Sequence, residues 1–458
     1  MNHVRALRSE GKTTSRKAQR SAQSSLSHTP RDSPMASLIT TPAHSAGNSR
    51  AGSDVTDDDD DFETMSVSSA TSSLIEYGGE DGISSFDARG LIDELQDRKH
   101  NNGDTREHLL ELYIKVLRNL YTAQTHDWLD DAATELAELF LRQANRGMTP
   151  RERILSLQAF ILTLSTSEDA DIYEQADKAM RQIVHDDDDE DCEVWAIYSL
   201  CFAVLYGGGS EDAAQETLDY LLDIVQTDGE SIEAHDSGLI VAAALQAWAF
   251  VASHVDDLSA TADLALDAFV DQLDSSNVQV QSHAAACIAL IFEASRNHEA
   301  ETGETFQLPY DPQRLIGRMK ELTKQCSKHV SKKNRKSLRD TFNSVTTSLE
   351  RGVGPGYSEA GFAPDKRNRL SAADVNEDGV VEFGYRLKLR LGCNTATIET
   401  WSLSSRVDML KLIFGGHLQR HMFVNPVVSE CLSDADFTKD SAGTKKPPKR
   451  SVPRDSKR

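Results

Sequence analysis

The sequence predicts an all-α protein built as an array of stacked helix pairs. Long apolar helical segments begin at residues 152, 192, 238 and 278, so successive starts lie 40, 46 and 40 residues apart (192 minus 152, 238 minus 192, 278 minus 238). Each segment except the last is closely followed by a more acidic, amphipathic one. A two-helix unit of this period is typical of HEAT and armadillo repeats, in which every repeat buries its inner helix against its neighbours.

Residues 1–84 precede the array and are rich in Ser, Thr, Asp and Gly, with few aromatic side chains. Such a segment buries too little apolar surface to offset the entropy of ordering the chain. We therefore expect a disordered tail, basic over residues 1–50 and acidic in the run DDDDDFE from Asp57. The mean hydropathy of −0.46 for the whole chain agrees with a disordered part.

The array itself is expected over residues 85–352. In REHLLELYIKVLRNLY the apolar side chains form one helical stripe, which comprises Leu109, Leu112, Tyr113, Val116 and Leu120. The most apolar run, residues 238–255, is slightly too short to span a bilayer and contains Gln246 and His254, so a buried helix is expected and no membrane partner. Two last helices should meet near residues 329–331.

Charge reverses abruptly at the end of the array. The chain carries a net charge of −24, which argues against simple nucleic-acid binding, yet residues 314–339 are dominated by Lys and Arg. Such side chains neutralise phosphates without reading sequence. A solvated helix face or a nuclear import signal in KKNRK is the alternative. The candidate phosphate-binding residues are Lys324, Lys328, Lys332, Lys333, Arg335, Lys336 and Arg339.

A Gly- and Pro-containing linker is expected over residues 353–380, followed by a small C-terminal domain at 381–432 and a basic disordered tail at 433–458. The stretch DVNEDGVVEFGY, Asp374 to Tyr385, resembles a calcium loop, but Tyr385 replaces the bidentate Glu that closes such a loop. Alternating apolar and polar residues from Val381 to Leu391 predict a short strand instead. We therefore expect no calcium site.

Two segments resemble the interferon-related developmental regulators. MKELTKQCSKHVSKKNRKSLRDTFNSVTTSLE resembles the end of that family's large N-terminal domain, and residues 383–432 resemble its small C-terminal domain. Phe383, Gly384 and Leu410 match the C-terminal pattern, as do Trp401, Gly415, His421 and Asn425. The chain departs from it at His417, where a second glycine is usual, and at Cys431.

The resemblance implies a regulator and no enzyme. Family members are described as transcriptional co-regulators and, for at least one branch, as factors that occupy ribosomes and hold them silent. We therefore expect binding to a ribosome or its RNA through the basic residues and the C-terminal helix. The alternative is a nuclear co-regulator whose concave array surface binds regulatory proteins, so the expected location is cytoplasmic, nuclear or both.

His421 and Asn425 lie four residues apart before Pro426, so they either orient the last helix or contact a partner. The sequence contains no nucleophile elbow, phosphate-binding glycine loop or paired zinc spacing. We expect no cofactor, metal or small-molecule substrate. Six scattered cysteines without a CxxC pair are typical of a reduced intracellular protein.

Overall fold

The computed structural model of the chain describes residues 88–97, 102–119, 121–167, 170–234, 236–304, 306, 308–325, 331–359, 374–375, 381–392 and 394–439. Most of these residues lie in packed helices, which confirms the all-α prediction. The predicted tails, apart from residues 433–439, fall outside the described residues, as do Leu120, Lys328 and most of the linker.

The helices form two rows that run down the molecule from α2 (Ala88–Gln96). Consecutive helices of the inner row pack on one another: α3 (Gly103–Asn119), α5 (Pro150–Leu164), α7 (Glu190–Tyr206), α9 (Gly238–Ala252), α11 (Val278–Thr302) and α13 (Lys332–Arg351). Each helix of the outer row packs on the inner helix that follows it: α4 (Ala123–Arg146), α6 (Tyr173–Asp186), α8 (Glu211–Gln226), α10 (Ser259–Gln272) and α12 (Pro312–Gln325). The short 3₁₀ turn η3 (Glu230–Ile232) precedes α9. The predicted array of helix pairs is confirmed.

The helices begin where the sequence supplies capping side chains. Thr149, Asp189, Ser210 and Ser237 each accept a hydrogen bond from a backbone N–H in the first turn of α5, α7, α8 and α9. Such a cap satisfies one of the N–H groups that a helix start leaves unpaired. The outer helices α6 and α8 bury one face, whereas α7 and α9 are buried on all sides over most of their length. An inner helix that is apolar all round needs a cover on both sides.

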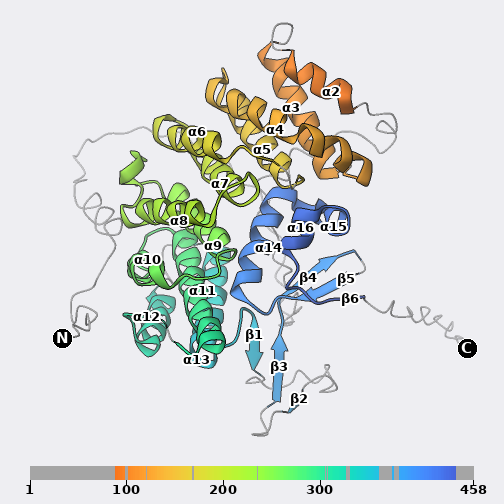
Figure 1. Cartoon of the computed structure of the whole chain (residues 1–458). Helices are drawn as coiled ribbons and strands as arrows, with labels where there is room; N and C mark the ends of the chain where they lie inside the picture. The colour runs from red at the N-terminus through yellow and green to blue at the C-terminus, as the bar shows by residue number, and fades with distance from the viewer. Residues whose placement is uncertain are drawn as a thin grey trace, which may run out of the picture.

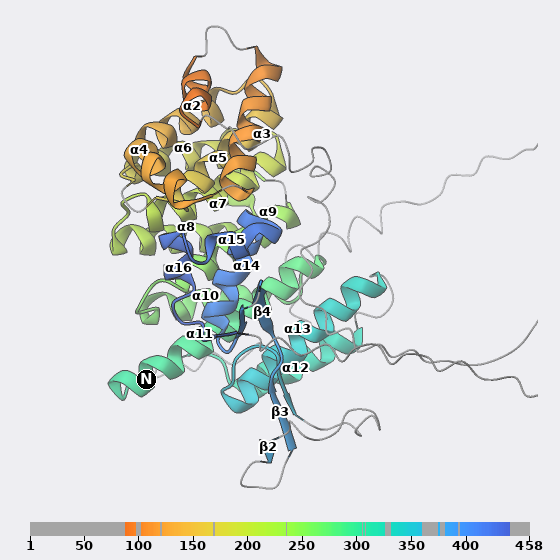
Figure 2. The same ribbon diagram turned by 90° about the vertical axis from the view of Figure 1, so that its right-hand side faces the viewer.

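The cover of the inner row is the C-terminal segment. It comprises α14 (Trp401–Phe414), η4 (Gly415–His417), α15 (Leu418–His421) and α16 (Pro426–Cys431). Helix α14 packs on α5, α9 and α11. Figure 1 shows these blue elements in the angle between the orange helices of the first repeats and the teal helices of the last, and Figure 2 shows them in front of the array.

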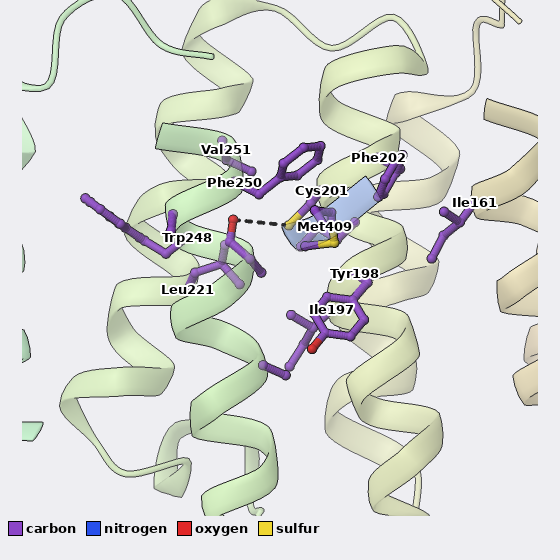
Figure 3. Close-up of a cluster of buried hydrophobic side chains, with 14 of the residues drawn as sticks. Ile161, Ile197, Tyr198, Cys201, Phe202, Leu221, Trp248, Phe250, Val251 and Met409 are labelled. Carbon is purple, nitrogen blue, oxygen red and sulfur yellow. Dashed lines mark hydrogen bonds between the residues drawn. The ribbon is translucent and has the colours of Figure 1, made fainter. Parts of the chain in front are cut away.

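Met409 of α14 illustrates this packing, because its side chain is fully buried. Figure 3 shows it among Cys201, Phe202 and Phe250 from α7 and α9, beside a weak contact of 3.9 Å between the Cys201 thiol and the Ala247 carbonyl. The C-terminal segment and the repeats therefore share one hydrophobic core. The run at 238–255 forms the buried helix α9, and no helix of the described residues is long and apolar enough to cross a membrane.

The strand prediction is confirmed for its location but is too simple. Residues 381–391 form two strands, β3 (Val381–Tyr385) and β4 (Lys388–Leu391), which belong to different antiparallel sheets. One sheet has the order β1 (Tyr357–Glu359), β3, β2 (Asp374–Val375); the other has the order β4, β5 (Asn394–Thr397), β6 (Phe437–Lys439). The chain changes sheet at Arg386 and Leu387, whose backbone groups pair with Gly356 and Ile398.

The described ends of the calcium-like stretch form a strand pair, with Asp374 opposite Glu382 and Val375 opposite Val381. Strands therefore stand where an EF-hand would have its second helix. Nearby, Gly354 allows a close approach, since a Cβ there would lie 1.8 Å from the Glu399 carbonyl oxygen. Only glycine lets the chain leaving α13 pass against the residues that lead into α14.

Candidate functional site

Helix α14 is fixed at its N-terminal end by an acidic side chain of α11. The Glu293 carboxylate accepts hydrogen bonds from the backbone N–H groups of Trp401 (2.8 Å) and Ser402 (3.0 Å). The Trp401 indole N–H donates to the Ser348 hydroxyl of α13 at 3.0 Å. A negative charge at a helix N-terminus is favourable. Burial raises the pKa of Glu293, while the two backbone hydrogen bonds oppose the shift.

The middle of the C-terminal segment is joined to α7 and α9. The Arg406 guanidinium donates to the Ser253 carbonyl at the end of α9 and pairs with Asp434 at 2.8 Å. The Tyr206 hydroxyl lies 2.7 Å from the Cys431 thiol. Burial raises the pKa of Cys431 to about 11, so this cysteine is a thiol and a poor nucleophile near neutral pH.

The far end of the segment is joined to the first repeats by Asn425 and His421. The Asn425 amide donates to the Ser165 carbonyl at 2.8 Å, and its oxygen caps α16 by accepting from Val428 N–H at 3.1 Å. His421 donates from Nε2 to the Arg118 carbonyl (3.2 Å) and accepts at Nδ1 from Asn425 (3.3 Å). Burial lowers the pKa of His421 to about 4, which keeps the imidazole neutral.

His421 also stacks on Tyr121, with ring centroids 4.9 Å apart. Both His421 and Asn425 are fully buried. In this structure they therefore orient the last helix and join it to α3 and α5, the first of the two roles considered from the sequence.

The basic surface lies at the opposite end of the array. Of the candidate residues whose side chains are described, Lys324, Lys333, Lys336 and Arg339 are exposed and Arg335 is half-buried. Lys328 is outside the described residues, and the side chain of Lys332 is not described. Leu338, Phe342 and Val345 of α13 are buried and face the core. Helix α13 thus presents Lys333, Lys336 and Arg339 to solvent on the side away from its buried stripe.

Two other basic side chains of α12 form ion pairs within the chain. Arg318 pairs with Asp274, and Lys320 pairs with Glu350 at 2.7 Å. Trp401 is buried, and Gly415 ends α14 with a φ of 56°, in the region that favours glycine. The sequence motif therefore combines packing and turn positions rather than one exposed site.

Glu293 and Ser165 are the principal contacts that sequence reasoning missed. Glu293 is the one acidic residue in the run ACIALIFEAS, and a lone carboxylate in a buried helix requires hydrogen-bond partners. That signal marks Glu293 as a residue that receives a partner, although it does not identify Trp401. Ser165 contributes only its backbone carbonyl to the contact with Asn425. The identity of its side chain therefore gives no sequence signal for this contact.

These features define a class of protein: a helical repeat array that carries its own C-terminal segment on its inner row and a basic surface at its last helix pair. The chain belongs to the interferon-related developmental regulator family, whose family model matches residues 63–350. It is also similar to an uncharacterized protein of Schizosaccharomyces pombe, with 24% identity over 391 residues, which cover 80% of this chain and 79% of the relative. The family description supports a regulatory protein.

Proposed function

We propose that this protein regulates translation without enzymatic activity by binding a ribonucleoprotein, the ribosome, and occupying a functional site on it. The observation that carries the proposal is the exposed basic face of α13, Lys333, Lys336 and Arg339, in a chain whose net charge is −24. Cationic side chains gathered on one face attract a phosphate backbone even though the rest of the chain is acidic. Near physiological salt concentration the charges of distant acidic residues are screened, so they do not cancel these short-range contacts.

The rigid connection between α13 and the C-terminal segment supports the same proposal. Trp401 joins α14 to α13 through Ser348 and to α11 through Glu293. The basic face and the C-terminal helices are therefore held in one fixed arrangement, which would give a large ribonucleoprotein surface two contacts in register.

The alternative, a nuclear co-regulator that binds regulatory proteins on the concave array surface, meets an obstacle. Helix α14 covers the inner row over α5, α9 and α11. A protein partner would have to displace α14 together with its contacts to Glu293, or use another surface.

The test is sedimentation of the tagged full chain with ribosomes through sucrose gradients at low and high salt. The variant Lys333→Glu/Lys336→Glu removes two exposed cations of α13. The control Arg142→Glu/Lys178→Glu changes the net charge equally, at exposed residues of α4 and α6. We expect co-migration of the wild type and the control at low salt, weakened by salt and by the α13 substitutions.

The salt dependence of binding gives the expected size of the effect. Each lost phosphate contact should reduce the slope of log affinity against log salt by about 0.7–0.9. A chain that stays at the top of the gradient at every salt concentration would refute the proposal. Equal binding by the α13 variant and its control would refute the assignment to this face.

A further inference from the structure

The strand β4 is an outer strand of its sheet and has one free edge. The sheet has the order β4, β5, β6, so β5 pairs with one edge of β4 only. Figure 1 shows this sheet below α15. The Leu389 and Leu391 side chains are buried and belong to the hydrophobic core. Strand β4 is therefore held in place before any partner binds.

The backbone groups of Lys388 and Arg390 point to this free edge. The Leu387 carbonyl accepts a hydrogen bond from the Ile398 N–H at 2.9 Å, and the pairing with β5 keeps this register along β4. In an antiparallel pair, alternate residues turn their N–H and C=O groups to the partner. The backbone groups of Lys388 and Arg390 therefore lie on the other edge, with which no strand of the described residues pairs.

The segment that precedes β1 does not continue along this edge. The Gly356 carbonyl accepts a hydrogen bond from the Arg386 N–H at 3.0 Å. Two residues earlier, Gly354 lies against the Glu399 carbonyl, just beyond β5 on the other side of the strand. The segment therefore leaves the free edge before it reaches Lys388.

The side chains of Lys388 and Arg390 lie on one face of β4, because the two residues are two positions apart. Both are exposed, and within the described part of the chain neither forms an ion pair. Opposite charges across a strand pair are favourable, and like charges are unfavourable. Two copies of β4 would place cations opposite cations, so the edge is complementary to an acidic strand and not to itself.

We propose that the free edge of β4 binds an extended acidic segment of another protein, which adds as an antiparallel strand with carboxylates opposite Lys388 and Arg390. In strand addition, backbone hydrogen bonds give affinity and the side chains give specificity. The partner therefore needs two acidic residues separated by one other residue. The site uses neither the basic face of α13 nor a phosphate, so it does not depend on the proposed function.

The test is fluorescence anisotropy of the full chain with the labelled peptide STVEVEVTS and with two N-methylated forms of it. Methyl groups on the two Glu nitrogens remove the N–H groups that would donate to the Lys388 and Arg390 carbonyls. Methyl groups on the Val nitrogens that follow each Glu leave these donors intact, because those N–H groups point away from β4. All three peptides have the same charge, so the comparison isolates the backbone hydrogen bonds.

We expect the peptide methylated on Glu to bind about ten-fold more weakly or worse, because two carbonyls of β4 lose their donors. The peptide methylated on Val should bind like the unmodified one. Equal affinities of the two methylated peptides would overturn the inference, since binding would then be electrostatic without strand pairing.

The variant Lys388→Glu/Arg390→Glu tests the charge complementarity, with Arg142→Glu/Lys178→Glu as the control for net charge. We expect the β4 variant to lose binding of STVEVEVTS and to bind STVKVKVTS instead, whereas the control keeps the preference of the wild type. Binding of the second peptide also shows that the edge remains folded. An unchanged preference in the β4 variant would overturn the inference.

Two other occupants of the edge give different results. A wild-type dimer in sedimentation equilibrium that dissociates as the peptide binds would assign the edge to a second copy. The acidic run from Asp57 to Asp61 is a poor strand, because Asp is depleted in strands. If Asn at all five positions raises the affinity for the peptide, this run occupies the edge. Either result would overturn the assignment to another protein.

Discussion

Replacement of Asn425 tests whether the C-terminal segment is an integral part of the array. In Asn425→Ala, α16 loses its cap, and the buried Ser165 carbonyl loses its donor. Loss of an N-cap costs about 1 kcal/mol. A buried polar group left without a partner costs about 1–3 kcal/mol. Together these terms predict that the free energy of unfolding falls by about 2–4 kcal/mol.

The two contacts can be separated by a second variant. Asn425→Ser keeps an oxygen that caps α16 but is too short to reach the Ser165 carbonyl, so about 1–3 kcal/mol should be lost. Ser429→Ala, at an exposed position of α16, is the control and should change the free energy of unfolding by less than about 0.5 kcal/mol.

The measurement is urea unfolding followed by circular dichroism, with the midpoint compared at unchanged slope. Hydrogen exchange adds the location, because amides of α14 to α16 should lose protection in Asn425→Ala. If Asn425→Ala unfolds at the same urea concentration as Ser429→Ala, the Ser165 contact does not hold the segment on the array, and the reasoning fails.

Three further outcomes follow from the same core. Glu293→Ala leaves the N–H groups of Trp401 and Ser402 without their acceptor and should cost about 2–4 kcal/mol in urea unfolding; a loss below about 0.5 kcal/mol would contradict this anchor. Met409→Ala opens a cavity under α14 and should cost about 2–5 kcal/mol by the same measurement, whereas no change would mean that α14 does not share the core. Burial, then Asp187 and other nearby carboxylates, raises the pKa of Glu193 to about 7, above its ordinary value of 4.5. Glu193 therefore contributes stability below about pH 4.5 that is lost as the pH rises through about 7, and Glu193→Gln should flatten this part of the stability curve in melting experiments at pH 5 and pH 8; an unchanged curve would refute the assignment.

The array was predictable because its signal is local. Apolar runs of helical period recur at intervals of 40 and 46 residues, and capping residues such as Ser210 and Ser237 precede the helices. Each repeat contacts only its neighbours, so the period alone defines most of the packing. The basic face of α13 was predictable for the same reason, since charge and helical spacing can both be read from adjacent residues.

The single strand predicted at 381–391 shows where local patterns fail. Alternation of side chains continues through Arg386 and Leu387, but the two halves pair with partners from different parts of the chain. Pairing between strands depends on which segments meet in space, and alternation carries no such information.

The sequence by itself determined that this is an all-α repeat protein with a basic end, because helical period, caps and charge are properties of neighbouring residues. Only the tertiary structure decided what Trp401, His421 and Asn425 do. Their partners, Glu293, Arg118 and Ser165, lie more than a hundred residues away, and two of them contribute backbone carbonyls that every residue possesses. A contact made by a carbonyl leaves no mark on the side chain of its owner, so the docking of α14 to α16 on the array becomes visible only once the chain is folded.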